Sequence, residues 1–186
     1  MKHQMPDWTE RISHHEILPN LFIAGEDEID ELLYGKEEAR RSYQTEEAPS
    51  APDPQIDVWL DVRDLRASNR QVVIPENVEW VQLPFRDGNV EEAEEVLPRA
   101  LALCQKAWNE EKRLLITCHQ GRSRSFLIMV RFLQELGYSY LDAYWMVKGK
   151  RSFVQEDKAF TDLLRKISIK DTESWVSSYI LKEPII

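Results

Sequence analysis

One stretch of the sequence combines a thiol, a glycine and two guanidinium groups within a few residues: it reads Cys-His-Gln-Gly-Arg-Ser-Arg-Ser over residues 118–125. Apolar runs on either side predict a β-strand at 113–118 and a helix at 124–137. A short loop that ends at a helix N-terminus directs several backbone N–H groups into one concavity, and the helix dipole adds partial positive charge. Gly121 gives this loop the backbone freedom of a tight turn, and Arg124 adds a planar pair of donors that fits two phosphoryl oxygens. The stretch therefore predicts a binding site for a phosphate group.

Cys118 would stand at the mouth of this site as a nucleophile. The helix N-terminus and the neighbouring arginine favour the thiolate, which is the reactive form of the side chain. Ser125 could hydrogen-bond this thiolate and help it to leave in a second step. The alternative is a buried structural cysteine at a strand end, and the company of Gly121 and Arg124 in this register speaks against it. The other cysteine, Cys104, lies on an apolar helix face and is expected in the core.

The elements around this loop predict an α/β domain, because strands alternate with helices along the chain. Two short extended pieces, broken at Pro19-Asn20, precede a short helix. Further strands are predicted at 56–62, 78–84 and 113–118, and helices at 26–34, 91–108, 124–137 and 140–147. Pro98 should start or kink its helix. A last amphipathic helix carries Ala159, Phe160, Leu163, Leu164 and Ile167.

The length of 186 residues fits one domain. We expect an N-terminal extension at 1–15, the domain at 16–168 and a C-terminal tail at 169–186. Residues 35–55 are charged and then rich in Ala, Pro and Ser, which predicts a loop or disordered insert.

The composition excludes several classes of protein. Two cysteines are too few for a disulfide framework, and the polar N-terminus lacks the apolar run of a secretory signal, so we expect a cytoplasmic protein with free thiols. The net charge of −9 makes nucleic acid an unlikely partner, and no apolar run is long enough to span a membrane. The histidines at positions 3, 14 and 15 lack ligand spacing, so no metal is expected. Nothing in the sequence predicts the oligomeric state.

The C-x5-R spacing, with glycine third after the cysteine and a Ser-Arg-Ser ending, resembles the signature of the protein tyrosine phosphatase superfamily, in its dual-specificity branch. The similarity extends over about residues 16 to 167 and includes the segment Leu-Pro-Phe-Arg-Asp, which ends at Asp87. It implies a three-layer α/β fold with a central mixed β-sheet of about five strands flanked by helices. It also implies a phosphorylated protein or a small phosphate ester as the substrate.

The resemblance assigns roles to individual residues. Cys118 would form a cysteinyl-phosphate, Asp87 would be the general acid and then the base, and Arg124 with the loop amides would stabilise the transferring group. Asp61 and Asp64 are the alternative acids. No cofactor is implied. The substrate-binding residues would be His119, Gln120, Gly121, Arg122 and Ser123.

One position departs from the family pattern: Thr117 stands where the family usually has histidine, which predicts weaker support for the thiolate. Other functions remain open. They are hydrolysis of a phosphoinositide or an RNA 5′-phosphate, phosphopeptide binding by an inactive pseudophosphatase, and sulfur transfer of the rhodanese type. Basic residues gathered at the rim would favour multiply phosphorylated substrates, although 148–151 is more simply predicted as a solvated turn.

Overall fold

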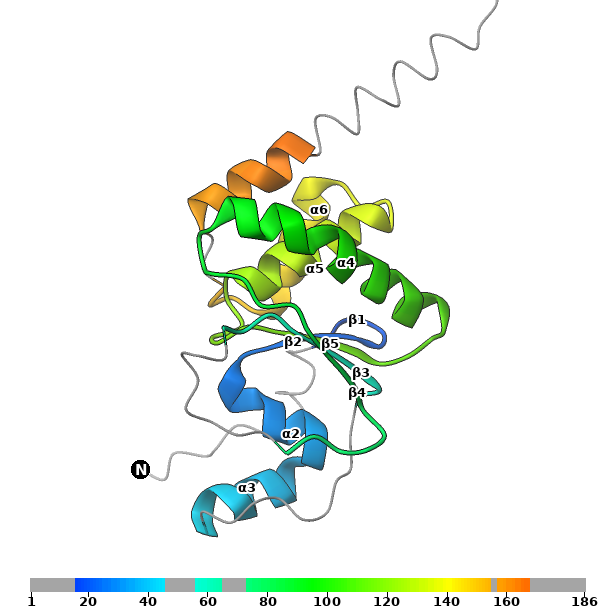
Figure 1. The fold of residues 1–186 in the computed structure, drawn as a ribbon, viewed down its shortest axis with the longest axis vertical. Coiled ribbons are helices and arrows are strands. Elements are labelled where there is room, and N and C mark those ends of the chain that lie inside the picture. The colour runs from blue at the N-terminus through cyan, green and yellow to red at the C-terminus, as the bar shows by residue number, and fades with distance from the viewer. Residues whose placement is uncertain (1–15, 46–55, 65–72, 155–156, 168–186) are drawn as a thin grey trace, which may run out of the picture.

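The computed structural model describes residues 16–45, 56–64, 73–154 and 157–167, which are arranged around one five-stranded sheet (Figure 1). The order of strands across the sheet is β1-β2-β5-β3-β4. β1 runs antiparallel to β2, and all other neighbouring strands are parallel, so the predicted mixed sheet is confirmed. The strands span Glu16–Leu18 (β1), Leu21–Ala24 (β2), Val58–Asp61 (β3), Glu79–Gln82 (β4) and Leu114–Thr117 (β5).

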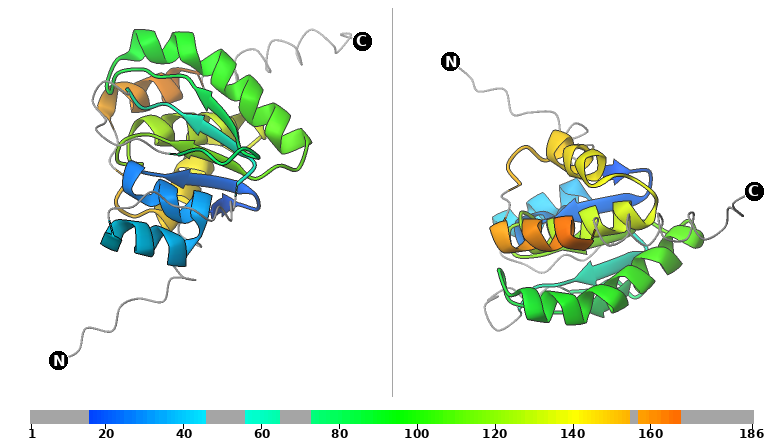
Figure 2. Two further views of the ribbon diagram at one scale, coloured as in Figure 1. Left: turned by 60° about the horizontal axis from the view of Figure 1, so that its bottom comes forward. Right: turned by 90° about the horizontal axis from the view of Figure 1, so that it is seen from above.

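Helices cover both faces of this sheet, which gives the three layers that the sequence predicts (Figure 1). One face carries η1 (Glu26–Glu28), α2 (Ile29–Tyr34) and α3 (Lys36–Thr45). The other face carries a helix at 158–167 together with α4 (Val90–Asn109), α5 (Arg124–Glu135) and α6 (Tyr140–Lys150). Figure 2 shows α5 between α4 and α6. This central place explains why most residues of α5 are buried.

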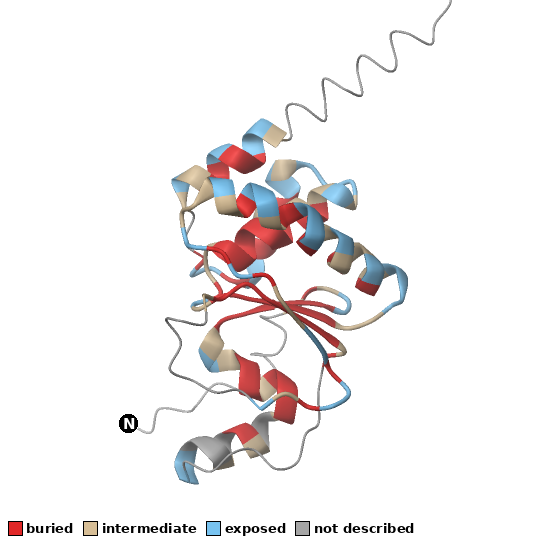
Figure 3. Cartoon of the chain, viewed as in Figure 1, coloured by how far each residue is buried: buried red, intermediate tan, exposed pale blue. Residues whose placement is uncertain are grey.

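Alternation of side chains along the strands creates two cores, one on each face of the sheet. Trp59 and Leu115 point to the same side as α2, where they pack with Ile29 and Leu33. The intervening strand residues face α4 and α5, and burial in Figure 3 is concentrated on the sheet and on the helix surfaces that meet it. These strand residues are Leu21, Ile23, Val58, Leu60, Leu114 and Ile116.

Hydrogen-bonding side chains define the starts of two helices. The Asn89 side chain accepts a bond of 3.0 Å from the Glu92 amide at the start of α4. Pro98 therefore lies inside this helix and does not start it. Ser139 accepts a bond of 3.1 Å from the Asp142 amide and donates to its carboxylate, which confirms the predicted start of α6.

The prediction of a loop or disordered insert at 35–55 is wrong for Lys36–Thr45, which forms α3. Alanine, glutamate and arginine are strong helix formers, and Ala39 is buried, so a short helix forms despite few apolar residues. Residues 46–55, the predicted extension at 1–15 and the tail from 169 lie outside the described residues. Within the described part of the chain, no helix has the length and apolar character needed to cross a membrane.

Candidate active site

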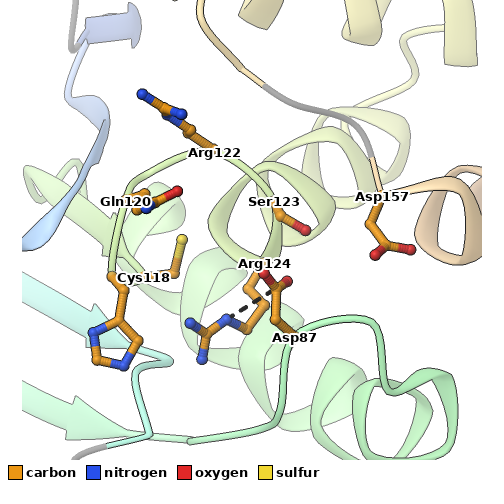
Figure 4. A pocket seen from close by; sticks show the side chains of 8 residues that line it. Asp87, Cys118, Gln120, Arg122, Ser123, Arg124 and Asp157 are labelled. Carbon is orange, nitrogen blue, oxygen red and sulfur yellow. Dashed lines mark ion pairs between the residues drawn. The ribbon is translucent and has the colours of Figure 1, made fainter. Parts of the chain in front are cut away.

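The loop at 118–123 joins the end of β5 to the start of α5 and forms the floor of a pocket of about 430 Å³. The geometry expected from the sequence is therefore present: a strand delivers Cys118, and Arg124 is the first residue of the helix. Figure 4 shows these side chains around the cavity. The lining residues are Asp87, Cys118, His119, Gln120, Arg122, Ser123, Arg124 and Asp157.

Gly121 lies where the backbone of the loop contacts the backbone at the end of β2. Its φ is +62°, and a Cβ there would lie 2.6 Å from the Ala24 carbonyl carbon and 2.6 Å from the Gly25 nitrogen. On the other side, a Cβ on Gly25 would lie 2.8 Å from the Gln120 carbonyl carbon. The Glu26 amide also donates to the His119 carbonyl at 2.8 Å. Two glycines thus let the loop and β2 approach closely enough to fix the loop in place.

Cys118 is only 3% exposed, and its Sγ lies 3.2 Å from the Ser125 Oγ. Ser125 is fully buried in the first turn of α5. Its hydroxyl can donate to a thiolate at this distance. The structure therefore brings together the two residues for which the sequence predicts coupled roles.

Arg124 is 5% exposed and is held in one orientation by main-chain acceptors. Its Nη1 donates to the Phe85 carbonyl at 3.0 Å and to the Val62 carbonyl at 3.4 Å. Its Nε lies 3.8 Å from the Asp87 Oδ1 and has no hydrogen-bond partner among the described residues (Figure 4, dashed line). This side of the guanidinium can therefore donate to a bound oxyanion.

Asp87 stands at the entrance to the pocket with 57% of its side chain exposed. It precedes Gly88, whose φ of +73° turns the chain toward α4. An exposed carboxylate next to the arginine can reach the oxygen that links a bound phosphate to its substrate. Asp87 therefore lines the pocket beside Arg124.

The alternative acid Asp61 has a different environment. It is 1% exposed and accepts bonds of 2.8 Å from both Nε and Nη2 of Arg63. Asp61 is thus committed to an ion pair and is not a free acid, so the structure contradicts this alternative. Thr117 lies beside the pair, since its Oγ1 accepts a bond of 2.8 Å from the Trp59 Nε1 and lies 3.4 Å from the Asp61 Oδ1.

Arg63 was not predicted from the sequence. Burial lowers the pKa of this guanidinium, but the bonds and charge of Asp61 and the charges of Glu26 and Cys118 outweigh burial and raise it. The signal in the sequence was the position of Arg63 two residues after Asp61, which is a carboxylate near the end of a predicted strand.

The prediction of a solvated turn at 148–151 is wrong for Arg151, which is fully buried. Its Nη1 donates to the Ile23 carbonyl at 3.1 Å, and its Nη2 donates to the Glu28 carboxylate at 2.9 Å. Lys148 donates to the Val154 carbonyl at 2.6 Å. Arg151 therefore supports the strand beneath the loop. Among Arg122, Lys148, Lys150 and Arg151, only Arg122 lines the pocket.

Two further side chains complete the lining. His119 lies 2.9 Å from the Glu26 carboxylate through Nδ1 and 3.2 Å from the Asp64 carbonyl through Nε2. Asp157 precedes the helix at 158–167 and accepts a bond of 2.8 Å from the Ala159 amide. Asp157 was not predicted from the sequence, although an aspartate before an amphipathic helix is a capping signal. Asp87 and Asp157 lie on the same side of the pocket in Figure 4.

No group of three or more metal-ligating side chains occurs among the described residues. Ser123 and Gln120 lie in the loop as predicted, and the Ser123 hydroxyl has no hydrogen-bond partner in the part of the chain that the structure describes. The arrangement as a whole offers a buried thiol, a fixed guanidinium, loop amides and an exposed carboxylate around one cavity.

Comparison with known proteins places this arrangement in context. Residues 41–170 match the sequence profile of the family described as dual specificity phosphatase, catalytic domain. No curated protein gives a significant match.

Several solved structures have the same fold. The chain is 20% identical to human DUSP28, with a TM-score of 0.61 over 84% of this chain and 93% of that one. It is 17% identical to human tyrosine phosphatase-like serine/threonine/tyrosine-interacting protein, with a TM-score of 0.63 over 84% and 96%. It is 15% identical to PTPMT1, solved in complex with PI(5)P, with a TM-score of 0.61 over 86% and 97%. At these identities the likeness concerns the fold.

Proposed function

Since the chain belongs to the dual specificity phosphatase family, we propose that it hydrolyses phosphotyrosine in proteins, and phosphoserine or phosphothreonine as well, through Cys118. Family membership makes the chain a phosphatase, whose substrates are phosphate esters. The observation that supports the role of Cys118 is that Cys118, Arg124 and Asp87 line one pocket, with Ser125 beside the thiol.

The first half of the reaction follows from this cluster. The Cys118 sulfur attacks phosphorus while the bond from phosphorus to the leaving oxygen breaks. Asp87 transfers its proton to that oxygen, so the leaving group departs as a neutral alcohol or phenol. The Arg124 guanidinium and the N–H groups of the loop stabilise charge on the three other oxygens.

The second half regenerates the enzyme. The ionised Asp87 takes a proton from water as the water oxygen attacks phosphorus. The bond between sulfur and phosphorus breaks, and inorganic phosphate leaves. Ser125 lies 3.2 Å from the departing sulfur, and its hydroxyl stabilises the thiolate that forms.

The charge around the entrance supports a protein substrate over a multiply phosphorylated lipid. Asp87 and Asp157 place two carboxylates on one side of the pocket. Arg151 and Lys148 are bonded to carbonyl groups elsewhere. Arg122 is on the opposite side of the pocket (Figure 4), so a second phosphate on the side of Asp87 and Asp157 would meet negative charge, which is unfavourable. A single phosphorylated side chain brings no such group.

The direct test is turnover of p-nitrophenyl phosphate in EDTA by the wild type, Cys118→Ser and Asp87→Asn. We expect activity in the wild type, none in the serine variant and a loss of about 10²–10⁴-fold in the asparagine variant. Cys104→Ser is the matched control, because Cys104 lies in the core, and it should keep wild-type turnover.

A substrate panel then tests the finer proposal, with phosphotyrosyl and phosphoseryl peptides, a phosphoinositide vesicle and an RNA 5′-phosphate. Higher kcat/KM for the lipid or the RNA than for any peptide would refute the protein substrate. Phosphopeptide binding without turnover would identify a pseudophosphatase. Sulfur transfer from thiosulfate to cyanide without phosphatase activity would identify a rhodanese-type enzyme.

A further inference from the structure

A series of buried polar contacts connects the residue before Cys118 to the residue after it. Thr117 contacts the carboxylate of Asp61 at 3.4 Å, and Asp61 is bonded to Arg63 through two bonds of 2.8 Å. The Arg63 Nη1 lies 3.6 Å from Glu26 Oε1, and Glu26 Oε2 lies 2.9 Å from the His119 Nδ1. The series therefore begins and ends at the two neighbours of the nucleophile.

Arg63 is the central member of this series and its only permanent cation. Its side chain is 2% exposed, and its Cζ lies 5.4 Å from the centre of the Trp59 ring. Its Nη1 has no hydrogen-bond partner among the described residues. A buried guanidinium with one donor left unbonded produces a field that water screens only weakly. Cys118 lies within reach of this field, because it stands between Thr117 and His119, the two residues at which the series begins and ends.

A second source of positive charge near Cys118 matters in this chain, because Thr117 stands where the family usually has a histidine and its hydroxyl supplies no positive charge. We propose that Arg63 is a positioning residue for Cys118: it links Thr117 to His119 through Asp61 and Glu26, and its charge favours the thiolate. This inference rests on the proposed role of Cys118 as the nucleophile. Arg63 does not line the pocket and therefore acts through the residues that it orients.

Several other charged groups surround Cys118 and set the background for this effect. They come from η1, from the end of β3, from the segment before α4, from the loop itself, from α5 and from the start of the last helix. These groups are Glu26, Asp61, Asp64, Asp87, His119, Arg122, Arg124 and Asp157. Each of them is retained in the Arg63 variants, so a difference between those variants reports on Arg63.

The test is the pH dependence of iodoacetamide alkylation at Cys118, followed by peptide mass mapping, in Arg63→Gln and Arg63→Lys. Glutamine can still donate to Asp61 but carries no charge. We expect the pH of half-maximal alkylation to rise by about one unit in the glutamine variant. Lysine keeps the charge and should restore the midpoint to within about 0.3 units of the wild type. In Arg63→Gln, the fraction of Cys118 that is present as thiolate is then about tenfold lower at low pH, and it recovers as the pH rises.

The matched control is Arg113→Gln. Arg113 donates to Asp57 through bonds of 3.0 and 2.8 Å at the other end of β3 and β5, so this variant loses a more exposed ion pair far from Cys118. Its alkylation midpoint should not change. Equal midpoints for the wild type and Arg63→Gln would overturn the proposal, as would a loss of reactivity that is the same at every pH, because the latter indicates a structural role alone.

If Arg63→Gln does not fold, the double variant Asp61→Asn with Arg63→Gln replaces the buried ion pair by an amide pair, which proteins often tolerate. Loss of the Asp61 charge acts on the thiolate in the opposite direction, so the reference for the double variant is Asp61→Asn alone. The midpoint should be higher in the double variant than in this reference, and equal midpoints would again refute the proposal. Alkylation needs no substrate, so the two hypotheses fail separately. A wild type without phosphatase activity but with the shift would refute the proposed function and leave this inference standing.

Discussion

Replacement of Gly121 by alanine should damage the site more than the same change at Gly25, Gly88, Gly137 or Gly149. The Cβ would lie 2.6 Å from two main-chain atoms, the Ala24 carbonyl carbon and the Gly25 nitrogen, and 2.7 Å from the Arg151 Nη2. Carbon atoms in contact ordinarily stay about 3.5–4.0 Å apart, so the loop must move by roughly 1 Å. The neighbours are backbone and a buried guanidinium, which cannot turn aside.

The magnitude has two parts. A non-glycine residue at the Gly121 φ of +62° costs about 1 kcal/mol, and the forced movement adds at least a similar amount. The total of about 2 kcal/mol lowers Tm by about 4–8 °C in a chain of this size. A displacement of about 1 Å in the groups that hold the phosphoryl oxygens lowers kcat/KM by about 10²-fold.

Gly137→Ala provides the matched control, because Gly137 has φ +96° but no atom of the described residues lies within 4 Å of the added Cβ. It should lose about 1 kcal/mol of stability and no activity. The assays are thermal unfolding and kcat/KM for p-nitrophenyl phosphate. Wild-type kcat/KM in Gly121→Ala, or equal stability losses in the two variants, would refute the argument that close backbone contact fixes the loop.

Three further predictions concern single side chains. Ser125→Ala removes the hydroxyl that stabilises the departing thiolate, so kcat should fall by about 10–100-fold. Stopped-flow assays should then show a burst of the first product, and the absence of a burst would argue against a role of Ser125 in the second step. Burial raises the pKa of Cys104, so iodoacetamide at pH 8 should modify Cys118 and leave Cys104 as the thiol, as peptide mapping will report. Gly149→Ala adds a methyl group in open space within α6 and should raise stability by about 0.5–1 kcal/mol in thermal unfolding, with kcat/KM unchanged; a lower Tm would contradict this.

The fold and the loop were predictable because their signals are local. Alternating apolar runs predict the strands and helices, and the order of thiol, glycine and arginine over residues 118–124 predicts a loop between β5 and α5. The mixed sheet of about five strands was implied by the family resemblance, since periodicity contains no information about which strands are neighbours.

The roles of Arg151, Arg63 and Asp157 were not predictable, because they depend on contacts between distant segments. Arg151 bonds to the Ile23 carbonyl from 128 positions away, so a basic stretch with the composition of a turn conceals a buried side chain. Arg63 pairs with Glu26 from another segment, and Asp157 lines the pocket from the start of the helix at 158–167, so neither position follows from local sequence. Helix α3 formed where composition predicted a loop, because helix propensity and one buried alanine were sufficient.

The most direct test of the central claim is to trap the intermediate. A peptide whose phosphotyrosine carries labelled phosphate is mixed with the enzyme, quenched within milliseconds and digested with trypsin. We predict label on the peptide of residues 114–122, attached to Cys118, in the wild type and in larger amount in Ser125→Ala, with none in Cys118→Ser. Turnover without label on this peptide, or with label on another residue, would contradict the account.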